Sequence, residues 1–427
     1  MTELGDCNNI TDLSYIANKS LIDLQENNPD LLIFPQTLGQ YRDDIEKSHI
    51  FSLDKDKLTT YNLMGFVGRN DTQLTITSRF SKNNQQDYFL HYMLQKVFSI
   101  NLLKFDQTPD KEYIWDFLLY LFPHFLKKAH MQGLYKAYKR EEYNDANVKG
   151  TIDVKRHIRI NIPFAGKVAY TTREHSYDNA VTQLIRHTIE HIKNHPFVSG
   201  ILTNDSETRD VVSKFCFVTQ NSYSKNARQK IISTNLKPVS HPYFTEYKML
   251  QKICLRILKR EKLTYGQERD KIYGLLFDGA WLWEEYLNTI LKQQGFLHPK
   301  NKDEKSGDKC IYLFENNGYK RFPDFYKDNI VLDAKYKSLK QNEAIDRNDI
   351  HQIISYMYVQ QANLGGFIYP EKDENKENTF KVGTLRGYGN SVKLWNIAIP
   401  QHKTKFQDFT ETIMENESRL VEKLINE

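Results

Sequence analysis

A short apolar run that ends in charged residues constrains this chain more than any other feature. Residues 330–332 (Ile-Val-Leu) lead directly into Asp333-Ala334-Lys335. Side chains on a strand alternate between two faces, so Asp333 and Lys335 share one face at the end of a buried element. A carboxylate and an ammonium buried there cost free energy unless they pair with each other or bind a metal. The run therefore predicts a strand of a covered sheet that ends in a charged site.

The surrounding segments predict a mixed α/β fold for the C-terminal part of the chain. Helical spacing of apolar residues covers 272–294 and 344–362, and a last helix starts near residue 407. Strand-like segments cover 310–315, 321–336 and 365–369, and two more strands follow. A helix that crosses between strands is typical of a mixed sheet flanked by helices. The predicted fold class is therefore α/β here and α+β overall.

Length and local pattern divide the chain into three predicted domains. The chain has 427 residues, whereas a domain usually has about 100–200. Residues 1–105 are rich in short β-like segments, 106–242 are mainly helical with one short strand at 148–154, and 243–427 hold the α/β domain.

The composition indicates a globular protein of the cytoplasm. The 26 Tyr and 24 Phe exclude a disordered chain, and the net charge of +5 allows a nucleic-acid partner. No run of about 18 apolar residues predicts a membrane span, and the polar N-terminus predicts no secretory signal. The four cysteines form no Cys-x-x-Cys pair, which argues against a structural zinc site and a disulfide framework.

Two more carboxylates are expected near the end of the charged strand. Asp324 lies on the preceding strand across a short turn, and antiparallel pairing can bring it to Asp333. On the helix before the sheet, at about 100° per residue, Glu284 lies at the margin of the apolar stripe, whereas Glu285 points to solvent. Asp324, Asp333 and Glu284 are the candidate ligands of Mg²⁺, which prefers oxygen donors. Lys335 would orient a water for metal-assisted phosphodiester cleavage.

The helix after the strands adds polar candidates. Gln352 and Tyr356 are four residues apart and share a helical face, and Asp349 and His351 lie nearby. Any of them could steady the lysine, a water or a phosphate oxygen. The alternative is that Asp-x-Lys is an exposed ion pair of little energetic value.

Two other signals have structural alternatives. Basic and aromatic residues in the middle segment are candidate DNA contacts, with a solvated surface as the alternative. They are Tyr135, Lys136, Lys139, Arg140, Lys155 and Arg156. His187, Glu190 and His191 spell a zinc-peptidase motif, but without an evident third ligand they indicate a solvated helix face.

The motif residues resemble a known nuclease superfamily. Pro323-Asp324 followed by Asp333-Ala334-Lys335, with Glu284 before and Gln352 after, is similar to the PD-(D/E)xK pattern. More narrowly, the chain resembles the McrC family, the nuclease subunits of McrBC-type restriction systems. Segments over most of the chain carry this likeness: 66–68 with 74–76, 133–138 with 149–153, 173–185, and 274–286. Trp283 stands where the family has Phe before the helix glutamate.

The resemblance implies a Mg²⁺-dependent endonuclease that cleaves both DNA strands. Asp324 and Asp333 would hold the metal, Glu284 would add a ligand, Lys335 would handle the water and Gln352 would support it. Mn²⁺ could replace Mg²⁺. The family implies a McrB-like AAA+ GTPase hexamer as partner, and this hexamer would bind the DNA. Docking of the nuclease subunit on the hexamer would stimulate GTP hydrolysis. Docking would use residues 1–105, and two complexes could meet for double-strand cleavage.

The nucleotide and the DNA target are expected to belong to the partner. The chain contains no Gly-x-x-x-x-Gly-Lys-Ser/Thr loop, so we expect it to bind no nucleoside triphosphate by that means. Methylated DNA (5-methylcytosine) and an unmodified specific sequence both remain open as targets. Two other functions also remain open: a non-catalytic activator of the ring, and a stand-alone repair nuclease that needs no partner.

Overall fold

The chain folds into two compact units. The computed structural model describes residues 7–28, 31–35, 49–54, 57–70, 72–80, 87–98, 113–195, 199–203, 205–263, 272–299, 310–337, 345–374 and 379–426. The first unit combines residues 1–107 with 269–427, and the second unit comprises residues 108–268. The N-terminal residues therefore group with the C-terminal ones. The division into three domains stays a prediction.

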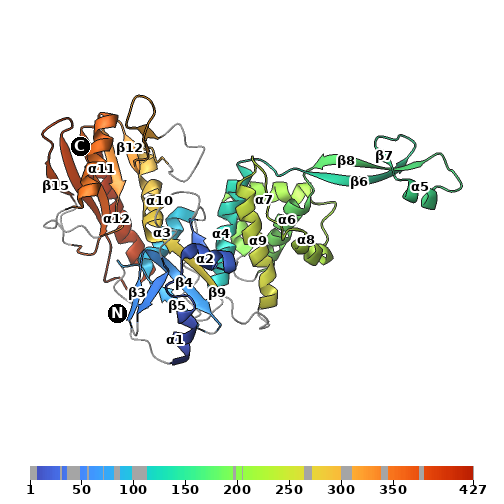
Figure 1. Ribbon diagram of the computed structural model, residues 1–427, viewed down its shortest axis with the longest axis horizontal. Coiled ribbons are helices and arrows are strands. Elements are labelled where there is room, and N and C mark those ends of the chain that lie inside the picture. Colours follow the sequence, from blue (N-terminus) through green and yellow to red (C-terminus); the bar gives the residue numbers. More distant parts are fainter. Residues whose placement is uncertain are drawn as a thin grey trace. The chain divides into compact units, whose positions relative to one another are not determined.

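A four-stranded sheet joins the N-terminal part of the first unit to the rest of it (Figure 1). Its order is β1 (Leu31–Phe34), β9 (Ile272–Asp278), β4 (Leu63–Arg69) and β5 (Thr72–Ile76). β1 runs parallel to β9, and the other pairs are antiparallel. The same core takes in α1 (Cys7–Ser14), α2 (Leu21–Asn27) and the hairpin of β2 (Phe51–Asp54) and β3 (Lys57–Thr60).

Residues 272–278 are a strand, so the prediction that a helix begins at residue 272 is wrong. The segment Ile-Tyr-Gly-Leu-Leu-Phe-Asp is apolar, and such a run cannot be assigned to helix or strand by periodicity. Two strands from the N-terminal part decide the outcome by pairing with it. The helix α10 (Gly279–Leu291) starts after Asp278, whose side chain accepts hydrogen bonds from the first backbone N–H groups.

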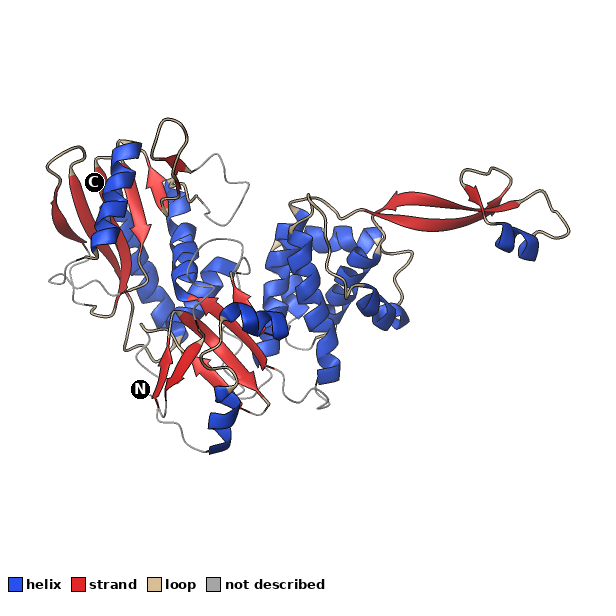
Figure 2. Ribbon diagram, viewed as in Figure 1, coloured by secondary structure: helices blue, strands red, loops and turns tan. Residues whose placement is uncertain are grey.

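The predicted mixed sheet is confirmed in the C-terminal part (Figure 2). Its order is β12 (Phe325–Lys327), β13 (Ile330–Ala334), β14 (Leu364–Glu371), β16 (Ser391–Ala398) and β15 (Thr379–Thr384). The three central strands are parallel and the two edge strands antiparallel. The helix α11 (Arg347–Gln360) connects β13 to β14, as expected for a parallel pair. A small hairpin of β10 (Ile311–Tyr312) and β11 (Lys320–Arg321) precedes the sheet.

Helices cover both faces of this sheet. α11 packs on the face that carries Val331 and Phe367. Leu332 and Trp395, which point to the other face, are also fully buried, while α10 lies against β13 and α12 (Phe406–Ile425) against β16. Burial on both faces explains why residues 330–332 are continuously apolar.

One buried glutamate ties three helices of this layer together. Glu417 of α12 accepts hydrogen bonds from Tyr286 of α10 (2.7 Å) and from Tyr92 of α3 (Tyr88–Phe98; 2.8 Å). It also forms a 2.9 Å ion pair with Lys96. Each polar group is therefore satisfied inside the core, which such burial requires.

The second unit is a helical body with a β arm. Its helices are α4 (Tyr113–His130), α6 (Ala180–Lys193), α7 (Ser206–Val218), α8 (Arg228–Thr234) and α9 (Glu246–Leu263). The arm consists of β6 (Ala137–Asp145) paired with β8 (Val168–Ser176), plus β7 (Thr151–Ile152) and α5 (Val154–Ile160). It projects away from the helices of its own unit (Figure 1). The short strand expected at 148–154 corresponds to β7, while β6 and β8 were not foreseen. In the described ranges, no helix has the length and apolar character that crossing a bilayer requires.

Candidate active site

Antiparallel pairing brings the two predicted aspartates together. Phe325 of β12 pairs with Leu332 of β13, so one further step along the register sets Asp324 opposite Asp333. Asp324 Oδ2 accepts a hydrogen bond of 2.7 Å from the backbone N–H of Ala334. The two carboxylates therefore meet at the end of β13, as the turn between the strands predicted.

Burial raises the pKa of both carboxylates. Asp333 is only 3% exposed, and its burial raises its pKa even though Lys335 acts in the opposite direction. For Asp324, burial and then the charge of Asp333 raise the pKa to about 8. Two close carboxylates cannot easily both be ionised in such a place. The pair therefore binds a proton near neutral pH unless another cation takes its place.

Lys335 is held between two acidic groups. Its Nζ lies 2.8 Å from Asp333 Oδ2 and 2.9 Å from Asp349 Oδ1. Burial would lower the pKa of Lys335, but these carboxylates outweigh it and hold the pKa above its usual value. Asp349 also pairs with Lys337 at 2.8 Å. Burial raises the pKa of Asp349, but the hydrogen bonds from the two lysines outweigh it and lower that pKa. Lys335 thus stays charged and fixed in position.

A cavity of about 380 Å³ opens over these groups. The five residues predicted for catalysis or metal binding all line it: Glu284, Asp324, Asp333, Lys335 and Gln352. They come from α10, from the residue before β12, from the end of β13 and from α11. Their convergence on one cavity is the geometric expectation on which the sequence interpretation depended.

The helix residues take more peripheral places. Glu284 is half-buried on the cavity wall. Glu285, expected to face solvent, is half-buried too, and it does not line the cavity. Gln352 is exposed, and its Nε2 donates a 2.8 Å hydrogen bond to the hydroxyl of buried Tyr356. Asp349, rather than Gln352, makes the contact with Lys335.

The aspartate pair fits a magnesium ion as a two-carboxylate site. In the part of the chain that is described, no three His, Cys, Asp or Glu side chains gather closely enough to hold a metal. Glu284 therefore shares the cavity without completing a three-acid cluster. Mg²⁺ commonly uses one or two carboxylates and keeps several waters. Asp333 Oδ2 is buried and accepts no well-directed hydrogen bond, although Lys335 Nζ is close, so it has capacity for a cation.

Two residues of the cavity wall come from a distant part of the chain and were not foreseen. Asn62 and Arg79 come from the N-terminal part of the first unit, beside β4 and after β5. Their side chains are joined by a hydrogen bond from the Arg79 guanidinium to Asn62 Oδ1. They lie more than 200 residues before Asp324 in the chain, and no local pattern connects the two regions.

A protein-family model identifies the family of this chain. The model described as "McrBC 5-methylcytosine restriction system component" matches residues 58–370, well over half of the chain. The chain belongs to this family. No curated protein matches it.

Two solved structures are similar to this chain, and the first shares its fold. One is the refined half-complex from a tetradecameric assembly of Thermococcus gammatolerans McrB AAA+ hexamers with bound McrC. The matched chain is 14% identical over 99% of this chain and 96% of that chain, with a TM-score of 0.50. Another is a chain of the cryo-EM structure of the Thermococcus gammatolerans McrBC complex. It is 14% identical over 65% of this chain and 81% of that chain, with a TM-score of 0.30. At this identity the first likeness shows the fold alone.

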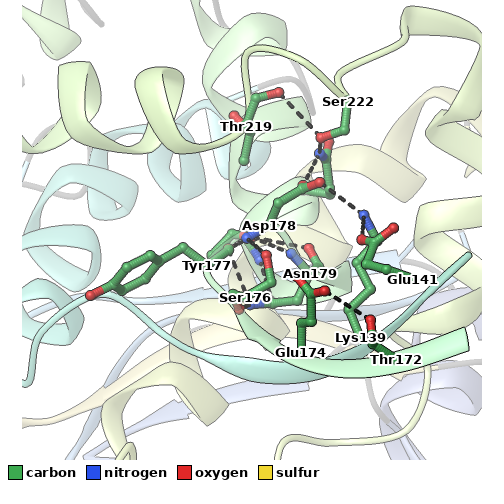
Figure 3. Close-up of polar contacts among 12 residues, drawn as sticks. Lys139, Glu141, Thr172, Glu174, Ser176, Tyr177, Asp178, Asn179, Thr219 and Ser222 are labelled. Atoms are coloured by element: carbon green, nitrogen blue, oxygen red, sulfur yellow. Dashed lines mark hydrogen bonds and ion pairs between the residues drawn. The ribbon is translucent and has the colours of Figure 1, made fainter. Parts of the chain in front are cut away.

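The predicted DNA contacts of this McrBC-family chain are spread over the second unit. Lys139 forms ion pairs with Glu141 (3.0 Å) and Asp178 (3.2 Å) at the base of the arm (Figure 3). Arg156 pairs with Glu142 at the far end. The structure does not gather the six residues into one surface, and their role stays a prediction.

The other four candidates differ in whether their side chains pack against aromatic rings or are exposed. Tyr135 packs against Phe244, with ring centroids 5.2 Å apart. Lys136 Nζ lies 4.3 Å from the centroid of the Tyr177 ring. Arg140 and Lys155 are exposed.

The zinc-peptidase alternative has no support in the geometry of α6. His187 is buried against Tyr223, with ring centroids 4.9 Å apart, so the predicted solvated face is wrong for this residue. Burial, followed by the charge of Arg228, lowers the pKa of His187. His187 is a core residue of the helical body.

Proposed function

We propose that this chain is the Mg²⁺-dependent endonuclease subunit of a McrBC-type restriction complex. The convergence of Asp324, Asp333 and Lys335 on one cavity carries the proposal. Two carboxylates and an ammonium at the end of a sheet are the groups that metal-assisted phosphodiester hydrolysis needs. Family membership supports a role in restriction of DNA. DNA that carries 5-methylcytosine is the first substrate to test.

Each residue has a defined task in this proposal. Asp324 and Asp333 would bind Mg²⁺, for which Mn²⁺ could substitute. The bound ion would polarise the phosphate and lower the pKa of a water. Lys335 would orient that water and offset negative charge on the phosphate, and Asp349 holds its ammonium from the other side. Glu284 and Gln352 would contact the ion's waters or the DNA from the cavity wall.

The energy source would be a separate ring. In the solved relative, McrC is bound to McrB AAA+ hexamers in a tetradecameric assembly. By analogy, this chain would dock on a McrB-like AAA+ GTPase hexamer and stimulate its GTP hydrolysis. Two such complexes would pair on double-stranded DNA for cleavage of both strands.

The arm offers a surface for this docking besides the predicted residues 1–105. Within the described part of 1–105, only Tyr15 and Tyr61 are large exposed apolar residues. On the arm, such residues follow one another: Val148, Ile152, Val154, Ile158, Ile160, Ile162 and Phe164. Clustered exposed aliphatic side chains mark protein interaction sites. We propose that the arm contacts the GTPase ring.

The decisive experiment separates catalysis from activation of the ring. Lys335→Ala should abolish DNA cleavage while the stimulation of partner GTP turnover stays at the wild-type level. Unchanged cleavage would discard the proposed site. Wild-type chain that never cuts DNA but stimulates GTP turnover would indicate the non-catalytic activator, and cutting without any partner would indicate a stand-alone nuclease.

A further inference from the structure

We infer that Arg79 binds a backbone phosphate of the DNA at the candidate active site. This inference rests on the proposed nuclease function and adds a substrate contact from the N-terminal part of the chain. Arg79 lines the same cavity as Asp333 and Lys335. It is exposed, whereas its neighbours Ser78 and Phe80 are buried. The turn thus presents a single cation to the cavity.

The turn that carries Arg79 is fixed on both sides. Ser78 donates its backbone N–H to Asp87, and its hydroxyl lies 2.9 Å from the hydroxyl of Tyr336. The carbonyl of Phe80 accepts a 3.0 Å hydrogen bond from Gln401. The Phe80 ring packs on Tyr336, with centroids 5.1 Å apart. Because the backbone on both sides of Arg79 is anchored, the Arg79 side chain is held near the cavity. Binding a ligand there therefore costs little conformational entropy.

The position of Arg79 is coupled to that of Lys335. Tyr336 directly follows Lys335 in the chain, and the Arg79 guanidinium carbon lies 5.5 Å from the centroid of its ring. Asn62 accepts a hydrogen bond from the guanidinium on another side. Both contacts orient the guanidinium without neutralising its charge.

Arg79 has no acidic partner among the described residues, unlike the other cations in this part of the cavity. Lys335 and Lys337 are paired with Asp349. No acidic side chain in the described part of the chain therefore offsets the charge of the Arg79 guanidinium, which has five N–H donors. A guanidinium matches the geometry of a phosphate with two parallel hydrogen bonds, and a phosphodiester is the anion that the proposed reaction brings to this cavity. A purely structural role would need only the contacts to Asn62 and Tyr336.

The test compares DNA binding by the full-length chain as a function of salt. The probe is a short fluorescent DNA duplex, with Ca²⁺ in place of Mg²⁺ to prevent cleavage. Arg79→Ala should weaken binding by about tenfold and reduce the slope of log K against log salt by about 1. Arg79→Lys should keep the slope and restore part of the affinity. Arg386→Ala, which removes an exposed arginine of the first unit away from the cavity, should change neither.

The outcomes separate this inference from the proposed function. A wild-type slope for Arg79→Ala overturns the role of Arg79, and a slope that Arg79→Lys fails to restore overturns the charge argument. Asp333→Asn serves as the reference for the site itself. If Asp333→Asn is inactive but Arg79→Ala binds normally, only the Arg79 inference fails. If Asp333→Asn still cleaves DNA, the proposed function fails whatever Arg79 does.

Discussion

Each of the two units holds a lysine between two acidic side chains, and the surroundings of these lysines differ. Lys335 pairs with Asp333 and Asp349, and its side chain is 19% exposed. Lys139 pairs with Glu141 and Asp178, and its side chain is 40% exposed. The arrangement of charges is similar, and Lys335 lines the cavity described above.

The hydrogen bonds of the acids explain the difference. Burial would raise the pKa of Asp178, but hydrogen bonds from Ser222, Gln183 and Lys139 outweigh it and hold the pKa below its usual value (Figure 3). Of the two acids beside Lys335, Asp349 also has a lowered pKa, whereas burial outweighs the effect of Lys335 and raises the pKa of Asp333. A satisfied cluster stabilises the native fold, whereas an unsatisfied one keeps binding capacity. The Lys139 cluster therefore fixes the base of the arm, and the Lys335 cluster is the proposed reaction site.

The largest expected effect separates the two clusters by activity. Asp333→Asn should lower the rate of DNA cleavage by about a thousandfold or more, because losing a metal ligand removes several kcal/mol of transition-state stabilisation. Asp178→Asn, the matched change in the other cluster, should leave the cleavage rate within about twofold. Single-turnover cleavage at saturating Mg²⁺ measures both. Equal losses of cleavage rate for the two variants would contradict the assignment of different roles to the two clusters.

A smaller loss is expected when Lys335 keeps its charge but loses its second anchor. Asp349→Asn should slow cleavage by about 10- to 100-fold, since misplacing a catalytic group by about 1 Å can cost that much. The affinity for DNA should change little. Lys337→Ala is the control, because it removes the other partner of Asp349 and leaves the Lys335 contact in place. A larger effect of Lys337→Ala would assign the key charge to Lys337 instead.

Much of this site could be predicted from local sequence. The apolar run before Asp333 fixed its burial, and the short turn fixed the antiparallel register that brings Asp324 to it. The other features could not be predicted, because they depend on contacts between distant parts of the chain. Residues 272–278 became a strand only because β1 and β4 flank them. Arg79 joins the cavity through tertiary contacts alone. The strands of the arm are exposed on both faces for much of their length, so they lack a clear alternation of apolar and polar residues.

Low pH should stabilise the first unit, because Asp324 is protonated in the folded state. Its folded-state pKa, about 8, is above the pKa of 3.8 that an aspartate has in the unfolded chain. Stability from this group is therefore full below pH 4 and is lost as pH rises through 8. Asp324→Asn should remove this dependence and raise the melting temperature at pH 8 by a few degrees, while abolishing cleavage. Thermal unfolding from pH 5 to pH 9 without divalent cations measures it, and parallel curves for the two proteins would contradict the shift.

The smallest effect is expected for Lys139, and it tests whether a satisfied cluster is inert towards DNA. Lys139→Ala should lower the free energy of unfolding by less than about 1 kcal/mol, because its ion pairs are exposed to solvent. Its ammonium is occupied by Glu141 and Asp178, so the salt slope of DNA binding should stay at the wild-type value. Arg140→Ala provides the comparison on the same strand, since Arg140 is exposed. If Lys139→Ala reduces the slope as much as Arg79→Ala does, then acidic partners do not prevent a cation from contacting phosphate, and the base of the arm joins the DNA-binding surface.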